Sequence, residues 1–164
     1  AIGAWLMSYS DVNTPFWTFA FFGCVSQLGL AFLMPSLSVA ALSALPSSQL
    51  YRGSGNVNFI RQLGGAVGTN LVVVWIQLRT AMHGDVLVST QTAANHTTRE
   101  FLAGVRDRLA GAVPGEVTDA VALEYLGRVI EAQALTLGFK DAFLALAVVF
   151  IVALVPAWVF ARTR

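Results

Sequence analysis

The sequence predicts an all-α, polytopic helical membrane protein, and three observations support this prediction. Hydrophobic residues make up 56% of the 164 residues and charged residues only 12%, about half the share that a soluble domain carries. The charges are concentrated in one stretch of the chain. The charge-poor stretches on either side hold segments of the roughly 20 apolar residues that a helix needs to cross a bilayer.

The distribution of charge locates these segments. Fourteen of the 19 charged residues lie between positions 79 and 141, and the other five are Asp11, Arg52, Arg61, Arg162 and Arg164. This pattern is typical of membrane helices joined by a water-exposed segment. The formal net charge of +1 provides no basic field for phosphates, so we expect no nucleic-acid partner.

The first two segments are separated by a polar turn. Residues 1–9 are apolar but too short to cross a bilayer, so we expect the end of a truncated transmembrane helix. A polar turn follows over 10–15, in which Pro15 is placed to open a helix. Residues 16–43 carry no charge and begin with several aromatic residues, which favours a transmembrane helix whose start lies at headgroup level.

Two further membrane segments flank the charged stretch. We expect a loop, which could contain a short surface helix, over 44–56. Transmembrane helices are expected over 57–78 and 138–161, and a tail over 162–164. The intervening segment, 79–137, is expected outside the membrane with two amphipathic helices. Apolar residues recur there at helical spacing, first as Phe101, Leu102, Val105 and Leu109, and then as Val117, Val121, Tyr125, Val129 and Ile130.

The arginines predict the orientation of these segments. The side with the 44–56 loop and the C-terminus carries four arginines and no acid, counting Arg61 near that face. The 10–15 turn carries −1, and the stretch 79–141 carries 6 positive minus 8 negative charges, or −2. Because positively charged loops favour the cytoplasm, we expect the loop and the tail to be cytoplasmic and the 79–137 segment to be extracytoplasmic.

The sequence offers no group of residues suited to catalysis or metal binding. The two histidines, His83 and His96, lie in the charged stretch, far in sequence from the single cysteine, Cys24. The acids lie at the spacing of solvated helix faces. Neither a nucleophile–base pair nor a metal-ligand spacing results, so we expect no catalytic, cofactor-binding or metal-binding residues and no enzyme.

Arg61 is the most informative single residue. It lies about one turn inside the 57–78 segment, where a charge is costly unless it is paired or in contact with water. One interpretation is that its side chain extends to the cytoplasmic headgroups. The other is a functional role, such as gating.

Polar and small residues share one face of the same segment. Four of them follow at spacings of four, three and four residues: Asn58, Gln62, Gly65 and Thr69. This face either lines a polar cavity or a moving interface, or it packs against another helix through Gly64 and Gly68 and through Gly65 and Thr69. The two interpretations can coexist.

Two candidates lie in other segments. Gln27 is a polar residue within the 16–43 segment. Asp141, next to Lys140, lies at the outer end of the last segment. It is either a solvated cap near a positive helix N-terminus or part of a proton relay.

The run from Leu45 to Thr69 resembles the late region of the 14-helix drug:proton antiporters of the major facilitator superfamily, the EmrB/QacA type. In that family a small-residue helix ends in Leu-Pro, here Leu45-Pro46, and a short loop leads to an Asn-Phe-x-Arg-x-x-Gly-Gly-like helix start, here Asn58 to Gly65. Gln133 and the Asp141-Ala142-Phe143 run before the last helix are also similar.

The resemblance implies the C-terminal part of a proton-coupled multidrug efflux transporter that exports lipophilic compounds by alternating access. The four apolar segments would be helices 11 to 14, and the proton-binding acids would lie in N-terminal helices missing from this chain. The proton gradient would supply the energy, with no cofactor. Partners would be the lipid bilayer, those N-terminal helices, small lipophilic substrates and, in some members, a periplasmic adaptor protein. The location would be the plasma (inner) membrane.

A second hypothesis belongs to another class of protein. The chain could be a small membrane scaffold or anchor that binds a partner through residues 80–137. The reading frame upstream of Ala1 discriminates the two hypotheses, because only the transporter requires ten further hydrophobic segments there.

Overall fold

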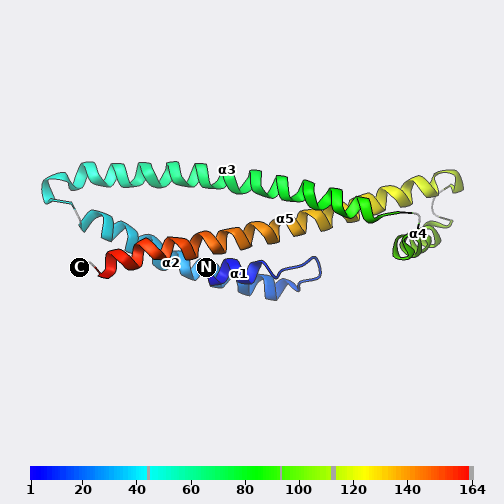
Figure 1. Cartoon of the computed structure of the whole chain (residues 1–164), viewed down its shortest axis with the longest axis horizontal. Helices are drawn as coiled ribbons and strands as arrows, with labels where there is room; N and C mark the ends of the chain where they lie inside the picture. The colour runs from blue at the N-terminus through cyan, green and yellow to red at the C-terminus, as the bar shows by residue number, and fades with distance from the viewer. Residues whose placement is uncertain (44, 93, 112–113, 163–164) are drawn as a thin grey trace. The chain divides into compact units, whose positions relative to one another are not determined.

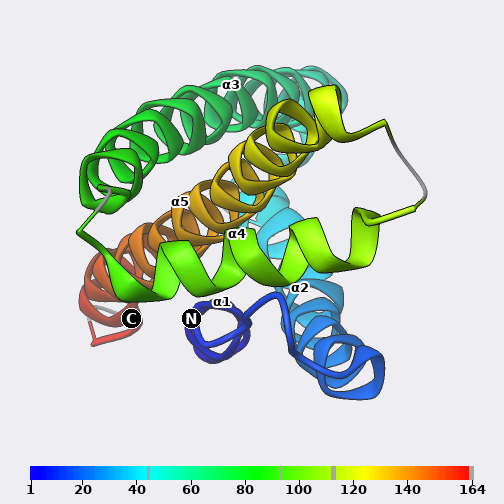
Figure 2. The same ribbon diagram turned by 90° about the vertical axis from the view of Figure 1, so that its right-hand side faces the viewer.

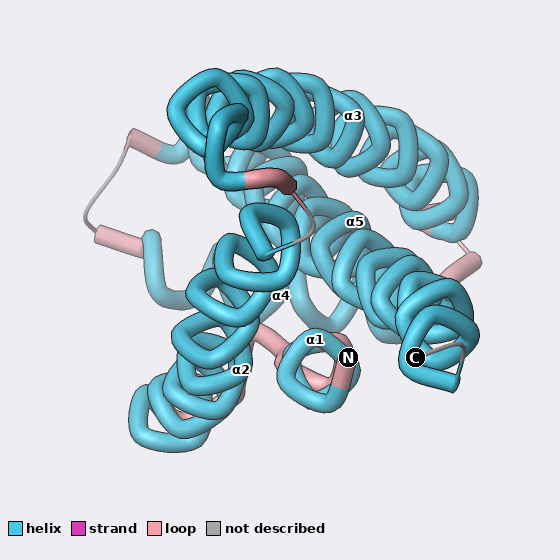
Figure 3. Tube along the Cα trace, turned by 90° about the vertical axis from the view of Figure 1, so that its left-hand side faces the viewer, coloured by secondary structure: helices cyan, strands magenta, loops and turns pink. Residues whose placement is uncertain are grey.

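The computed structural model of the chain describes residues 1–43, 45–92, 94–111 and 114–162. These residues form α-helices and one short 3₁₀ helix, with no β-strand among them (Figures 1 and 3). The predicted all-α fold is therefore confirmed. The elements are α1 (Ile2–Met7), α2 (Phe16–Ser43), η1 (Ser47–Gln49), α3 (Leu50–Thr90), α4 (His96–Leu109) and α5 (Gly115–Arg162).

The chain divides into two compact units, which are described separately. Unit 1 comprises Ala1–Trp75 and Lys140–Arg164, and unit 2 comprises Ile76–Phe139. The two long helices, α3 and α5, each contribute one part to each unit.

In unit 1, α1 packs against α2 through small residues. Gly3 is buried, and a Cβ atom added to it would lie 2.7 Å from the Cα atom of Ser26. One turn further along α1, the Met7 side chain is also buried, with its Cε atom 3.7 Å from the position of a Cβ on Gly23. Close backbone approach at small residues is how helices associate in lipid.

Three helices are long and apolar enough to cross a membrane, namely Phe16–Ser43, Leu50–Thr90 and Gly115–Pro156. No residue of α2 or α3 is buried among those described. Large hydrophobic side chains stand fully outward, including Trp17 at 81% and Phe32 at 75% exposure. Such a continuous apolar surface would aggregate in water, whereas in a bilayer it contacts lipid or neighbouring helices.

In unit 2, α3 and α5 approach each other closely at Gly138. This glycine is buried, and a Cβ atom on it would lie 3.1 Å from the Ile76 carbonyl oxygen and 3.2 Å from the Thr80 nitrogen. About two turns after Ile76 on α3, a Cβ atom added to Gly84 would lie 3.9 Å from the side chain of Ala134 on α5. Small residues therefore set the distance between the two helices over at least two turns.

Helix α4 is held against both long helices of unit 2, and it lies beside the first part of α5 in Figure 2. Arg106 Nε forms an ion pair with Asp119 Oδ1 at 2.7 Å. The rings of Phe101 and Tyr125 stack with their centroids 5.9 Å apart. At the other side, Thr98 Oγ1 donates to Gln91 Oε1 at 2.6 Å.

Asn95 caps the start of α4. Its Oδ1 atom accepts hydrogen bonds from the backbone N–H groups of Thr97 at 3.1 Å and Thr98 at 3.4 Å. Its amide nitrogen donates to the Thr90 carbonyl at the end of α3, at 2.9 Å. The Asn95 side chain therefore caps the N-terminus of α4 and also links it by a hydrogen bond to the end of α3.

The helix bounds differ from the expected segments in two respects. Residues 50–56, expected in a loop, form the first turns of α3. The expected 57–78 helix continues to Thr90, and the second amphipathic helix of the 79–137 segment is continuous with the last apolar segment in α5. The 41 residues of α3 measure about 60 Å, twice the hydrocarbon thickness of about 30 Å.

These lengths change the expected picture of the outer segment. A helix of this length is long enough to cross a bilayer and to extend beyond it. Residues 79–137 consist largely of continuations of α3 and α5. Ala44 and the Thr163–Arg164 end of the expected tail lie outside the described residues. The membrane side of each segment stays a prediction.

Candidate functional site

Arg61 on α3 contacts α2 in unit 1. Its Nη2 atom donates a hydrogen bond to Ser38 Oγ at 2.6 Å. The Ser38 hydroxyl in turn donates to the Met34 carbonyl within α2, at 2.8 Å. Ser38 is half-buried, and the Arg61 side chain is otherwise exposed. A single hydroxyl thus accepts from one helix while it donates within the other.

This contact gives Arg61 a polar partner without neutralising it. No acidic side chain among the described residues lies within ion-pair distance of Arg61. An uncompensated charge at this depth is tolerated where water or headgroups reach it. The link to Ser38 is compatible with both sequence interpretations of Arg61, because it positions the guanidinium group at the tip of the side chain and leaves its charge accessible.

The polar face predicted on α3 is not covered by other parts of the described chain. Asn58, Gln62, Gly65 and Thr69 are exposed, and Gly68 is half-buried. A Cβ atom added to Gly64, Gly65 or Gly68 would meet no neighbouring atom within 4 Å. The packing interpretation therefore finds no partner helix within the described residues, and the role of this face stays a prediction.

The other two predicted candidates, Gln27 and Asp141, lie on other helices than Arg61. Gln27 is exposed on α2, and no hydrogen bond joins it to another described residue. Asp141 is half-buried on α5 and belongs to unit 1. Its role as a cap or as part of a proton relay stays a prediction.

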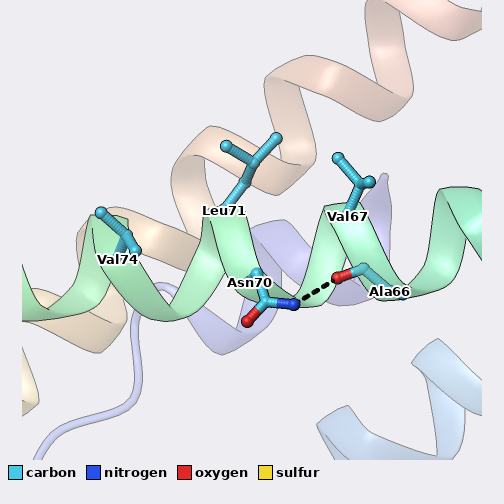
Figure 4. A pocket seen from close by; sticks show the side chains of 5 residues that line it. All are labelled: Ala66, Val67, Asn70, Leu71 and Val74. Atoms are coloured by element: carbon cyan, nitrogen blue, oxygen red, sulfur yellow. Dashed lines mark hydrogen bonds between the residues drawn. The ribbon is translucent and has the colours of Figure 1, made fainter.

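The structure draws attention to Asn70, which sequence reasoning did not select. It lies on α3 at a shallow, open depression of about 340 Å³ that residues of this one helix line, as Figure 4 shows. Its amide nitrogen donates to the Ala66 carbonyl at 2.8 Å. The remaining lining residues are apolar: Val67, Leu71 and Val74. An amide inside an otherwise apolar stretch was the available signal, but Asn70 lies outside the four-residue face.

Ser38 is a second residue that the sequence analysis did not select. Its hydroxyl proves to be the hydrogen-bond partner of Arg61. The distance of 23 residues between them gives no helical spacing from which this pairing could have been found.

No metal centre is evident in the part of the chain that the structure describes. Histidine, cysteine, aspartate and glutamate do not gather there in groups of three or more. Cys24 is exposed on α2, and His96 pairs with Glu100 on the surface of α4 at 3.3 Å. Neither Cys24 nor His96 belongs to a group of metal ligands within the described residues.

The apolar helices, their exposed faces and the charged second unit define a multi-pass, all-α membrane protein. The chain is similar to the colistin resistance protein EmrB of Acinetobacter baumannii, with 33% identity over 156 residues. The match covers 92% of this chain and 29% of that relative, so the chain spans less than a third of the relative's length. No family model matches the chain, and no solved structure matches it.

Proposed function

We propose that this chain is the C-terminal part of a proton-coupled multidrug efflux transporter of the EmrB/QacA type in the major facilitator superfamily. The similarity to the colistin resistance protein EmrB over 92% of the chain is the observation that carries this proposal. The three helices suited to crossing a membrane support it independently. In such a transporter, substrate binds near the bilayer midplane between helical halves that rock to give alternating access.

The residues of this chain would then form walls beside the central path. The Arg61–Ser38 hydrogen bond joins α2 and α3, so the two helices would move together during the rocking motion. The uncovered face with Gly64, Gly65 and Gly68 would pack against helices that precede this chain. Small residues permit such close and movable packing in lipid.

The proposed protein lies in the plasma (inner) membrane with its C-terminus in the cytoplasm. Exposed arginines at the start of α3 and the end of α5, Arg52 and Arg162, support this orientation. Arg162 also lies over the Trp158 ring, with its guanidinium carbon 3.8 Å from the ring centroid. Tryptophan and arginine together are typical of a membrane–water interface.

Small lipophilic compounds are the proposed substrates, and a periplasmic adaptor is a proposed partner. Colistin, a larger cationic lipopeptide that the name of the relative mentions, is a further compound to test. The full-length protein that contains this chain should be expressed in an efflux-deficient bacterium, and the intracellular level of a fluorescent lipophilic cation should be followed. We expect lower accumulation than in the empty-vector strain, and a protonophore should abolish the difference.

Export that persists after the proton gradient has collapsed would refute proton coupling while leaving export established. An absence of export with normal membrane expression would instead favour the scaffold hypothesis. In that case, a partner captured through residues 80–137 should be lost when those residues are replaced by a neutral linker.

A further inference from the structure

Unit 2 contains a hollow that none of the proposed transport residues line. Its volume is about 230 Å³, and residues of three helices line this open hollow. Helix α3 contributes Leu87, and Gln91 follows directly after the end of α3. Helix α4 contributes Thr98 and Phe101. The wall from α5 is made of Leu126, Val129, Ile130 and Gln133, and Asn95 and Thr97 complete the rim.

The separation of the three helices is fixed by contacts around the hollow. On one side, α4 is held to α5 by the Arg106–Asp119 ion pair and the stacked rings of Phe101 and Tyr125. On the other side, Thr98 and Gln91 join α4 to the end of α3. Because these contacts hold α4 at both ends, it cannot easily collapse onto the apolar wall.

Most polar groups in the wall of the hollow have hydrogen-bond partners, whereas Gln133 has none among the described residues. Thr98 is 8% exposed and is bonded to Gln91, and the Gln91 amide nitrogen donates to the Leu87 carbonyl at 3.1 Å. Asn95 is engaged as the cap of α4. Gln133 is half-buried, and its amide forms no hydrogen bond with another described residue. The Gln133 amide is therefore available to hydrogen-bond a molecule that enters the hollow.

We propose that this hollow binds a small, neutral aromatic molecule that carries one amide group, with Gln133 as its hydrogen-bond partner. Apolar cavities of about 150 Å³ accommodate benzene, so about 230 Å³ is sufficient for a substituted single ring. Phe101 offers an aromatic face, and Leu126 and Ile130 offer aliphatic contacts. A primary amide matches the Gln133 amide, because each group presents one donor and one acceptor to the other.

The ligand is neutral because no charged residue lines the hollow. A charged ligand would lose its hydration without gaining an ion pair. Most charged residues of unit 2 lie on its exposed helix faces, among them Glu124, Arg128 and Glu131. They keep the surface of the unit in water while the interior stays apolar.

This site extends the proposed function in one respect. If unit 2 lies outside the membrane, the hollow is a second, outer site for exported aromatic compounds, and this assignment rests on the proposed function. The binding proposal itself does not, since binding is measured without transport.

The test uses the full-length protein in lipid nanodiscs and the photoreactive probe 4-azidobenzamide. After illumination, the labelled peptides are identified by mass spectrometry. We expect saturable labelling within residues 87–133, and benzamide should suppress this labelling by competition. Benzoate, its charged counterpart, should be a weaker competitor by at least about ten-fold.

Three variants sharpen the test. Gln133→Leu retains most of the volume and should weaken benzamide competition about five- to ten-fold through loss of the hydrogen bond. Val129→Phe should abolish labelling by filling the hollow. Gln77→Leu makes the same chemical change at an exposed residue of α3 outside the lining and should leave competition unchanged.

Folding and transport are monitored separately in every variant. Thermal unfolding shows whether Val129→Phe remains folded, and Gln133→Leu provides the answer if it does not. Labelling that is not saturable, that lies outside unit 2, or that is equal in wild type and Gln133→Leu would overturn the binding site. Absence of export by the wild-type protein, with saturable labelling of unit 2 intact, would count against the proposed function only.

Discussion

At the scale of single residues, Arg61 shows how a cost predicted from sequence is met in the structure. A charged residue within an apolar segment required either a partner or access to water. The structure supplies the Ser38 hydroxyl, which is itself anchored to the Met34 carbonyl of α2. The guanidinium therefore has a defined position while its charge stays exposed.

Replacing Arg61 tests whether this link has a role in transport. Under the proposed function, we expect Arg61→Ala to impair drug resistance while membrane insertion and expression stay normal. The link contributes about 1 kcal/mol, so Ser38→Ala should reproduce part of the effect. Resistance is measured as the minimal inhibitory concentration of a lipophilic cation.

The matched control is Arg52→Ala, because Arg52 is an exposed arginine earlier in the same helix. It removes a positive charge without removing the contact with α2. Normal resistance in the Arg61→Ala strain would reduce Arg61 to an anchor for headgroups. Equal losses in both variants would mean that charge alone matters.

Gly138 is the residue at which the packing of unit 2 is most restrictive. We expect Gly138→Ala to destabilise the protein by roughly 1 to 3 kcal/mol through overpacking, since the added methyl group would lie 3.1 Å from the Ile76 carbonyl oxygen. The measurement is the thermal unfolding midpoint of the purified full-length protein.

Gly127→Ala is the control for this substitution. Gly127 lies in the same helix, and a Cβ atom there would meet nothing within 4 Å. The exchange of glycine for alanine in a helix should therefore stabilise by about 0.5 to 1 kcal/mol. Two midpoints that move in the same direction would contradict the assignment of Gly138 as a contact point.

At the scale of elements, the apolar pattern was a reliable guide within the membrane segments and a weaker one at their ends. The α2 helix covers the same residues, 16–43, as the predicted segment. The start of α3 differs from the prediction, which placed residues 50–56 outside the membrane helix. In the structure, Gly53 leaves room for Leu45, whose Cγ atom lies 3.5 Å from the position of a Cβ.

That difference has a physical cause. Glycine is less favourable than alanine in a helix by about 1 kcal/mol. Two glycines within a few residues therefore argue strongly against a helix when only the local sequence is considered. The packing of Leu45 against the helix at Gly53 stabilises the helical conformation of these residues. Such a contact joins residues separated by a chain turn, and local propensity does not contain it.

The cap of α4 gives a prediction for an element as a whole. Asn95→Ala should destabilise α4 by about 1 kcal/mol, because the N–H groups of Thr97 and Thr98 lose their acceptor. Hydrogen–deuterium exchange of the backbone amides in 96–109 should become about five-fold faster.

Asn95→Ser retains an oxygen acceptor and should keep most of the protection. Exchange in α2, which belongs to unit 1, serves as the internal reference. Unchanged exchange in α4 after the alanine substitution would show that packing against α5 alone holds the helix.

At the scale of the whole molecule, the arrangement of charges predicts how the chain lies in the membrane. We expect a cysteine introduced at Asp119 to react with a membrane-impermeant maleimide added outside intact cells. A cysteine at Arg52 should react only after the cells are opened. Both are made in a full-length protein with Cys24 replaced by serine, since Cys24 is exposed in the structure.

The expected result follows from the excess of arginine at one end of the membrane helices and of acid at the other. Labelling with the sides exchanged would overturn the orientation. Labelling of both positions from outside would place α3 on one side of the membrane, in conflict with a membrane crossing by that helix.

The sequence by itself determined that this is a helical membrane protein with a charged segment between apolar ones. Those properties depend on composition and on local periodicity, and both can be obtained directly from the amino-acid sequence. Only the tertiary structure decided that α3 and α5 extend through the charged segment, that Ser38 receives Arg61, and that Gln133 faces a hollow between three helices. Each of these depends on contacts between residues far apart in the chain, and a contact of that kind leaves no local pattern in the sequence.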